Sequence, residues 1–389
     1  MVAATKNLRM FLLTAEGLVC CRWDGRSEQV EFLNRALEGE TVREVAQDSA
    51  NPNRLYAATS TEIHVSEDGG ESWKWLPSGG IDYRDIWTMR AHPTRPDEIY
   101  VGTLPAAVYV SENGGRSFRE LAAFRQLSEY NKWAFPPPPH TAHIRCITLD
   151  GRVPDEIVAA VEEGGVARSR DRGETWEDIS GPASPTAYPE VNDTSGQIPY
   201  QMGQHEEGRV YRDVHWVVRH PARLGRLYAT TGIGTYRTDD DGRRWSKMEY
   251  GMGRAYAIPI AIHRAAPERI FLGAAENGPA SWKGYRTVRA GPYNTVRFSR
   301  DTSQEKGGAR TAILRSHDGG ETWRRLNGGL PEAHWHMTCG FAMHPEEPET
   351  VCVGYTDGSV YATGDAGESW RQLEVSRPKL YGVRLIFTS

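Results

Sequence analysis

Short stretches in which apolar residues dominate or alternate with polar ones recur along the whole chain, separated by turns rich in Gly, Pro, Asn and Asp. The first are LRMFLLTA at 8–15, GLVCCRW at 17–23 and QVEFL at 29–33, and the last is YGVRLIFTS at 381–389. Such short stretches with a period of two are typical of β-strands. No stretch reads as a long helix, so the pattern predicts an all-β chain of many short strands.

One eight-residue motif recurs with the consensus Ser/Thr-x-Asp-x-Gly-x-Ser/Thr-Trp. Its six copies lie at 66–73, 111–118, 169–176, 238–245, 316–323 and 363–370. The second copy has Asn113 and Phe118, and the fourth has Arg244, in place of the consensus residues. The Asp carboxylate can accept bonds from nearby backbone N–H groups, and Gly supplies a positive φ, so each copy predicts a tight turn. The aromatic residue is then expected to pack between neighbouring sheets.

A second pattern precedes each motif: a polar turn that leads into a β-branched or aromatic strand. Examples are HPTRPDEIYVGT at 92–103, HPARLGRLYATT at 220–231 and HPEEPETVCVGY at 344–355. One unit is therefore strand A, a turn, strand B, a loop, strand C, the eight-residue turn and strand D. Repeated units of four antiparallel strands are typical of a β-propeller.

The repeats predict a single domain, a seven-bladed β-propeller of four-stranded antiparallel blades over 1–389. The three N-terminal strands lack the motif, and one C-terminal strand is left over; pairing them would close the ring and remove the free sheet edges. Six or eight blades are the alternatives. The predicted limits are blade 1 at 1–40 plus 380–389, blade 2 at 41–80, blade 3 at 81–127, blade 4 at 140–181, blade 5 at 209–250, blade 6 at 253–330 and blade 7 at 333–376.

The eight-residue motif resembles the Asp-box, or BNR repeat, of sialidases and related propellers. In sialidases this motif is structural, and the resemblance does not extend to an Arg-Ile-Pro segment near the start, so sialidase activity is not implied. Xyloglucanases, sortilin luminal domains and photosystem II assembly factors are similar in blade architecture. The resemblance to xyloglucanases implies acidic catalytic residues in a cleft between two propeller domains, whereas this chain predicts one propeller. The assembly-factor resemblance implies a binding scaffold.

Charge and cysteine content narrow the expected partners. The formal net charge of −5 gives no electrostatic case for nucleic acid or an anionic membrane. No apolar run approaches the roughly 18–20 residues that span a bilayer, and a signal-peptide core is lacking at the start. The five cysteines, Cys20, Cys21, Cys146, Cys339 and Cys352, are irregularly spaced. They favour reduced thiols in a cytoplasmic protein.

Unequal spacing between the motif copies marks three insertions, at 128–141, 181–209 and 276–310. The first two fall between strand D of one blade and strand A of the next, and the third between strands B and C. In a four-stranded blade these connections emerge on the same face, opposite the eight-residue turns. The long loops are therefore expected on one face, where binding sites are usually built.

Histidines cluster at the starts of the predicted A strands, which lie at the channel mouth on the long-loop face. They are His140, His143, His215, His334 and His336. Imidazoles from three blades could bind a divalent transition metal such as Zn, Mn or Fe. His143, His215 and His336, with Tyr211 and Tyr256, are also candidates for catalytic groups. The alternative is that these histidines are only the polar lining of a water-filled channel.

Arginines are expected at the same mouth, and they could bind a carboxylate or sulfate. The predicted substrate-binding residues are Arg43, Arg84, Arg145, Arg212, Arg254 and Trp87. The alternative is pairing of these arginines with Glu44, Asp85 and Asp213 in the channel wall. Three acidic residues of the B–C loops, Glu162, Glu163 and Glu276, could act as acids or bases or be surface charges.

Two functions of different classes follow. The first is a hydrolase or lyase that acts at the channel mouth on a small or saccharide-like anionic substrate. The second is a non-enzymatic scaffold that binds a protein partner on its long-loop face. A polar mouth closed off from water would favour the enzyme, and a flat apolar face with aromatic anchors would favour the scaffold.

Overall fold

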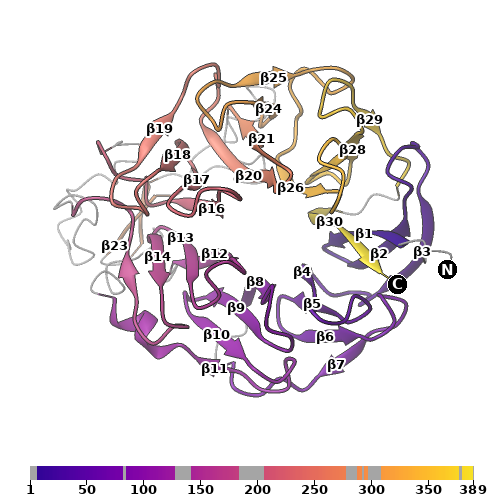
Figure 1. Ribbon diagram of the computed structural model, residues 1–389, viewed down its shortest axis with the longest axis horizontal. Helices are drawn as coiled ribbons and strands as arrows, with labels where there is room; N and C mark the ends of the chain where they lie inside the picture. Colours follow the sequence, from indigo (N-terminus) through magenta and orange to yellow (C-terminus); the bar gives the residue numbers. More distant parts are fainter. Residues whose placement is uncertain are drawn as a thin grey trace.

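Seven four-stranded antiparallel sheets form a ring around a central channel (Figure 1). The structure is a computed structural model and describes residues 7–81, 85–127, 142–183, 206–276, 287–290, 293–296, 308–375 and 379–388. This arrangement confirms the predicted seven-bladed propeller and excludes the six- and eight-bladed alternatives.

Each blade is described from the channel outward. Blade 1 consists of β30 (Leu380–Thr388), β1 (Asn7–Thr14), β2 (Gly17–Arg22) and β3 (Glu31–Ala36). Blade 2 consists of β4 (Val42–Gln47), β5 (Leu55–Thr59), β6 (Ile63–Ser66) and β7 (Lys74–Leu76). Blade 3 consists of β8 (Asp85–Ala91), β9 (Ile99–Leu104), β10 (Val108–Ser111) and β11 (Arg119–Glu120), followed by the 3₁₀ helix η1 (Ala122–Gln126). Blade 4 consists of β12 (His143–Leu149), β13 (Ile157–Glu162), β14 (Gly165–Ser169) and β15 (Glu177–Asp178).

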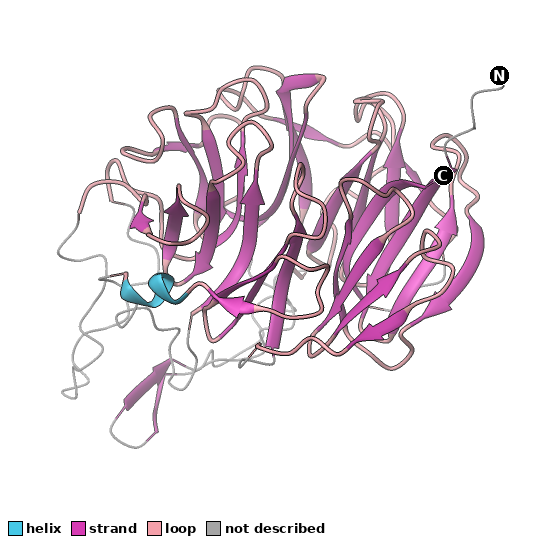
Figure 2. Cartoon of the chain, turned by 60° about the horizontal axis from the view of Figure 1, so that its bottom comes forward, coloured by secondary structure: helices cyan, strands magenta, loops and turns pink. Residues whose placement is uncertain are grey.

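The remaining blades repeat the order. Blade 5 consists of β16 (Val214–Arg219), β17 (Leu227–Thr231), β18 (Gly234–Thr238) and β19 (Ser246–Met248). Blade 6 consists of β20 (Tyr256–His263), β21 (Ala266–Ala275), β24 (Ala312–Ser316) and β25 (Arg324–Leu326). Blade 7 consists of β26 (Thr338–Met343), β27 (Val351–Tyr355), β28 (Val360–Thr363) and β29 (Arg371–Gln372). A separate hairpin, β22 (Thr287–Ala290) and β23 (Tyr293–Val296), interrupts blade 6 between β21 and β24 and projects from the ring (Figure 2).

The C-terminal strand closes the ring as predicted. β30 pairs antiparallel with β1 from Asn7↔Thr388 to Thr14↔Leu380, so both ends of the chain lie in one blade. This pairing removes the free edges that blade 1 would otherwise present.

The hydrophobic core lies between adjacent sheets, because each cluster of buried side chains draws residues from two neighbouring blades. Tyr56 of blade 2 packs with Met89 and Val101 of blade 3, for example. The motif tryptophans contribute to these layers: Trp245, Trp323 and Trp370 are buried. No helix in the described ranges is long and apolar enough to cross a membrane.

Every innermost strand has a β-bulge near the channel mouth. The strand pairing shifts register between Val42 and Glu44 in blade 2, and at the equivalent point of each other blade. The residues that the ladders skip are Arg43, Trp87, Arg145, His215, Ile258 with Pro259, Cys339 and Tyr381. A bulge leaves its extra residue unpaired and re-aims the side chain. Accordingly, six of these seven positions line the central cavity, the exception being His215.

Candidate functional site at the channel mouth

The central channel contains a cavity of about 570 Å³ at the level of the bulges. Its volume falls in the range of roughly 300–1,000 Å³ that is usual for small-molecule sites. The lining includes Trp87, Trp216 and Trp335 as aromatic surfaces and Arg43 and Arg145 as cations. The floor includes Glu44, which is buried and binds both Arg90 and Arg384, with 2.6 Å between Glu44 Oε1 and Arg384 Nε.

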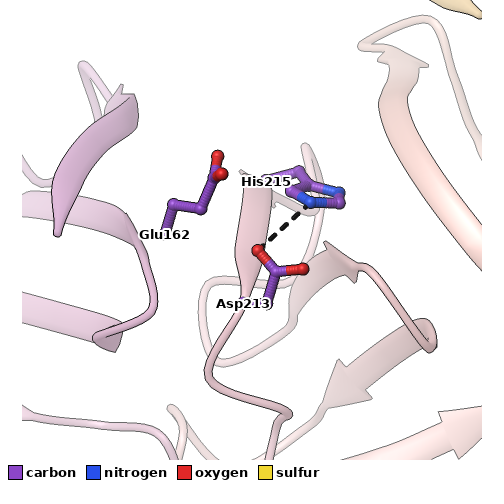
Figure 3. Close-up of side chains that lie close together, drawn as sticks. All are labelled: Glu162, Asp213 and His215. Carbon is purple, nitrogen blue, oxygen red and sulfur yellow. Dashed lines mark ion pairs between the residues drawn. The ribbon is translucent and has the colours of Figure 1, made fainter. Parts of the chain in front are cut away.

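Two buried carboxylate–imidazole pairs lie beside this cavity, one on each of two adjacent blades. On blade 4, His143 Nε2 and Arg145 Nε are each 3.1 Å from Glu162 Oε2. On blade 5, His215 Nε2 is 3.3 Å from Asp213 Oδ1. Figure 3 shows the Glu162 side chain extending toward the Asp213–His215 pair. Ligand atoms of these three residues lie within 4.8 Å of one another.

Contacts with aromatic rings connect the blade 4 pair to the cavity. The Trp87 ring lies 4.0 Å from the His143 ring between centroids, and the Arg145 guanidinium is 5.3 Å from the centroid of Trp87. Because Trp87 and Arg145 also line the cavity, a ligand in the cavity would be adjacent to the carboxylate–imidazole cluster.

Electrostatics set different protonation states in the cluster. Burial alone would raise the pKa of Glu162, but the adjacent His143 and Arg145 charges hold it well below its usual value. Burial acts to lower the pKa of His215, but the adjacent Asp213 carboxylate outweighs it, so this pKa is raised above its usual value. Burial, together with the Asp213 charge, raises the pKa of Tyr256 well above 10. The site therefore combines an ionised carboxylate with a phenol that keeps its proton.

Arg43 is a cation that has no carboxylate in direct contact among the described residues, although the Asp85 charge acts on it from a longer distance. Its guanidinium carbon is 4.7 Å from the ring centroids of both Trp87 and Tyr381. Its Nε is buried without a hydrogen-bond partner, and it forms no ion pair within 4 Å with any described residue. Burial lowers the pKa of Arg43, which reflects the cost of desolvating this charge.

The other predicted arginines have partners. Arg212 Nε is 2.8 Å from Glu163 Oε2, and Arg254 NH2 is 3.1 Å from Glu276 Oε1. Arg254 also lines a second cavity of about 360 Å³ between blades 5 and 6. Arg145, Arg212 and Arg254 thus pair with the acidic residues Glu162, Glu163 and Glu276 of the B–C loops, and not with Glu44, Asp85 or Asp213 as the alternative proposed. Glu162 and Glu163 are buried, so they are not surface charges.

The five histidines do not form one ligand set in the described ranges. His140 and Arg84 lie outside the described residues. His334 stacks on Tyr355, with 3.8 Å between ring centroids, and its Nε2 is 3.4 Å from Ser359 Oγ and 3.8 Å from Asp357 Oδ2. Within those ranges, the group of three ligand atoms close enough for a metal contains His215 alone among the five. The predicted transition metal stays a prediction.

The three remaining candidates for catalytic groups lie in different places. Tyr256 is adjacent to His215, with 4.9 Å between ring centroids, and belongs to the cluster. Tyr211 packs against the hydrophobic layer between blades 4 and 5. His336 lines the cavity at blade 7.

The sequence predicted Asp213 only as a partner for an arginine, and not as a member of the carboxylate–imidazole cluster. The available signal was the Asp-x-His spacing at the start of an inner strand, where alternate residues share a face.

Comparisons with known proteins support the fold. A curated oligoxyloglucan-reducing end-specific xyloglucanase from Emericella nidulans is 22% identical over 334 residues, which are 79% of this chain and 37% of that protein. The solved GH74 xyloglucanase from Xanthomonas campestris is 16% identical with a TM-score of 0.60, covering 98% of this chain and 52% of that one. YCF48 bound to D1 peptide is 13% identical with a TM-score of 0.52, covering 90% and 92%.

The chain spans little more than a third of the length of the curated relative that it matches. No family model matches the chain, so the Asp-box resemblance stays an interpretation of the motif.

Proposed function

We propose that the chain is a hydrolase that acts on an anionic, saccharide-like substrate at the channel mouth. The observation that carries the proposal is the buried cluster of Glu162, Asp213, His143 and His215 beside a cavity that Arg43 lines. Buried carboxylate–imidazole pairs with perturbed protonation are typical of catalytic sites. The similarity to xyloglucanases supports a saccharide as substrate.

Glu162 and His143 are the proposed acid–base pair. Hydrolysis needs a base for the attacking water and an acid for the leaving oxygen. Glu162 is held ionised and can accept the proton of a water molecule. His143 Nε2, 3.1 Å from Glu162 Oε2, can pass a proton to the leaving oxygen. Tyr256 keeps its proton and can donate a hydrogen bond to the substrate.

Arg43 is the proposed anchor for the anionic group. Its guanidinium lies between two aromatic rings, which orient it, and Arg43 lines the cavity without an ion pair within 4 Å to a described carboxylate. A guanidinium can bind a carboxylate or a sulfate through two parallel hydrogen bonds. Trp335, 41% exposed at the rim of the cavity, offers a face for a sugar ring.

A protein-binding scaffold is the second candidate. The similarity to YCF48, in a structure bound to D1 peptide, extends over 92% of that chain, so a propeller of this size exists as a peptide-binding unit. Under this function the arginines and Trp335 would contact a peptide, and the carboxylate–imidazole cluster would have no catalytic consequence.

Incubation with uronic-acid-containing, sulfated and neutral xyloglucan oligosaccharides tests the proposal. We expect new reducing ends from at least one anionic class and little from the neutral one. A product whose ultraviolet absorbance indicates a new conjugated double bond would instead indicate a lyase. Glu162→Gln should lower kcat by about 10²–10³-fold, because general acid–base groups contribute by that order.

Glu156→Gln is the matched control, because Glu156 immediately precedes β13 and Glu162 ends it, both are similarly buried and each pairs with an arginine. Glu156 lies on the far face, so its variant should lose stability and keep kcat. Equal loss of activity in both variants, or no turnover of any saccharide by folded protein that binds a peptide, would refute the proposal and favour the scaffold.

A further inference from the structure

We propose that Glu162, Asp213 and His215 bind a divalent transition-metal ion, Zn²⁺ or Mn²⁺. The role of the ion rests on the proposed function, because it would hold the water that attacks the substrate. The binding itself does not depend on turnover and can be measured alone.

The first observation concerns the tautomer of His215. Its Nδ1 is 2.6 Å from the backbone oxygen of Ala257, and a carbonyl only accepts hydrogen bonds, so Nδ1 carries the hydrogen. The neutral ring therefore presents a lone pair at Nε2. An Nδ1–H bonded to a backbone carbonyl is the usual support for a histidine that binds metal through Nε2.

The second observation is that two electron-rich atoms face each other. His215 Nε2 and Asp213 Oδ1 are 3.3 Å apart, and neither forms a hydrogen bond with the described residues. His215 is 1% exposed and Asp213 8%, so bulk water does not compensate them. The pair requires either a proton or a metal ion between the two atoms, and a metal ion would replace the proton that Asp213 favours on Nε2.

The third observation is a second carboxylate from the neighbouring blade. The contacts of Glu162 with His143 and Arg145 both fall on Oε2, which leaves Oε1 for an ion. Ligand atoms of the three residues lie within 4.8 Å of one another (Figure 3). Ligands at about 2.0–2.2 Å from a tetrahedral ion are roughly 3.3–3.6 Å apart. Side-chain rotations that move the ligand atoms by about 1 Å would therefore complete the site.

Gly232 supports the orientation of Asp213. A Cβ at position 232 would lie 2.3 Å from Asp213 Oδ2 and 3.7 Å from Tyr256 Cε2, so the absence of a side chain leaves the space that this carboxylate occupies. Gly232 is thus a positioning residue for the proposed ligand set.

The donor set suits these ions. One imidazole nitrogen and two carboxylate oxygens are typical ligands of Zn²⁺ and Mn²⁺. The two carboxylates carry two negative charges, which balance a divalent ion, and Arg145 beside Glu162 adds one positive charge at the edge of the site.

Isothermal titration of metal-free protein with ZnCl₂ and MnCl₂, with Mn²⁺ electron paramagnetic resonance as a second readout, tests the proposal. We expect a single ion per chain. His215→Ala and Glu162→Gln should each weaken binding more than about 10-fold, since even changes to residues that only support a metal ligand cost that much. His334→Ala is the matched control, because His334 lies on blade 7 beside Asp357 and Ser359 and outside the ligand set; its variant should bind as the unaltered protein does.

Near-ultraviolet circular dichroism and thermal midpoints of the metal-free variants establish whether they fold. Gly232→Ala keeps all three ligands but crowds the Asp213 carboxylate, so this variant should weaken metal binding as well. Absence of binding at millimolar metal, or unchanged binding by folded His215→Ala, would overturn the proposal. Hydrolysis that persists without metal would overturn the role of the ion in the reaction and leave the proposed function standing. Metal binding without any hydrolysis would support the metal site and count against the proposed function.

Discussion

Aspartate serves two different purposes on the two faces of the ring. In the fifth repeated turn, Asp318 accepts hydrogen bonds from the backbone N of Thr322 at 2.9 Å, its hydroxyl at 2.6 Å and the Ser316 hydroxyl at 2.7 Å. Asp68 has the same three partners in the first turn. Asp213, at the channel mouth, has a buried Oδ1 with no hydrogen bond from the described residues.

Histidines show the same contrast. His92 uses its whole ring within the protein: Nδ1 accepts from the backbone N of Arg95 at 3.0 Å, and Nε2 lies 2.8 Å from the Pro154 oxygen of the next blade. His215 uses only Nδ1 in this way. The repeated groups Asp68, Asp318 and His92 are thus satisfied within the protein and hold the fold. Polar groups that occur once and remain unsatisfied are available to a ligand.

The largest effect expected from this contrast is that of Asp213→Asn. We expect kcat to fall by about 10³-fold, because the charge belongs to the reacting cluster. Stability should stay unchanged or rise by about 1 kcal/mol, because the variant removes a buried, poorly compensated charge. Initial rates and urea unfolding measure the two quantities. A loss of several kcal/mol would instead place Asp213 with the structural aspartates of the turns.

Gly70→Ala should have the opposite profile. Gly70 has φ of +95°, and a Cβ there would lie 2.7 Å from Phe11 Cε1 of blade 1. We expect a loss of about 2–4 kcal/mol in the free energy of unfolding, from backbone strain and overpacking, with unchanged activity per folded molecule. Gly364→Ala, also in a repeated turn, is the control, since a Cβ at position 364 would have no neighbouring atom within 4 Å. Equal losses in both variants would count against this explanation.

Arg43→Met sharpens the contrast within the channel mouth itself. The variant keeps much of the apolar stem and removes the charge, so KM for an anionic substrate should rise about 10–100-fold, as expected for a lost charge-assisted pair. KM for a neutral analogue should change little, because the aromatic neighbours Trp87 and Tyr381 remain. Steady-state kinetics on both substrates provide the test, and a parallel rise in both KM values would show that Arg43 only supports the aromatic rings.

The smallest effect concerns acid pH and the repeated turns. Burial acts to raise the pKa of Asp318, but hydrogen bonds from Thr322 and Ser316 together outweigh it and lower this pKa from 3.8 to about 2. The stabilisation is thus present above pH 3.8 and is lost as the pH falls through about 2. Asp318→Ala should cost about 1 kcal/mol at neutral pH and reduce the acid sensitivity in this window. Urea midpoints measured between neutral and acid pH test this, and an identical pH profile in the variant would contradict it.

The repeat made most of the fold predictable from the sequence. Gly, Asp and Trp at fixed spacing mark each turn, and local hydrogen bonds enforce that turn whatever the rest of the chain does. The leftover strand at 381–389 identified how the ring closes, because an unpaired edge strand is unfavourable. The predicted site residues His143, Arg145, His215 and Tyr256 do lie together, since the starts of neighbouring inner strands converge on the channel axis.

The pairings inside the site were not predictable. Glu162, at the end of β13, and Glu163, just after it, have a sequence typical of a polar surface loop, yet both are buried against residues of the neighbouring blade. His334 starts an equivalent strand, but it stacks on Tyr355 of its own blade.

By itself, the sequence determined the number of blades and the positions of the repeated turns, because the repeated motif acts through contacts between residues close in the chain. Only the tertiary structure decided which side chains meet at the mouth. At the bulges, the strand pairing skips Arg43, Trp87 and Tyr381, and these residues line the cavity. Adjacent blades bring Glu162 close to Asp213 and His215. Those contacts join residues from different blades, and their register depends on one-residue shifts that no local pattern encodes.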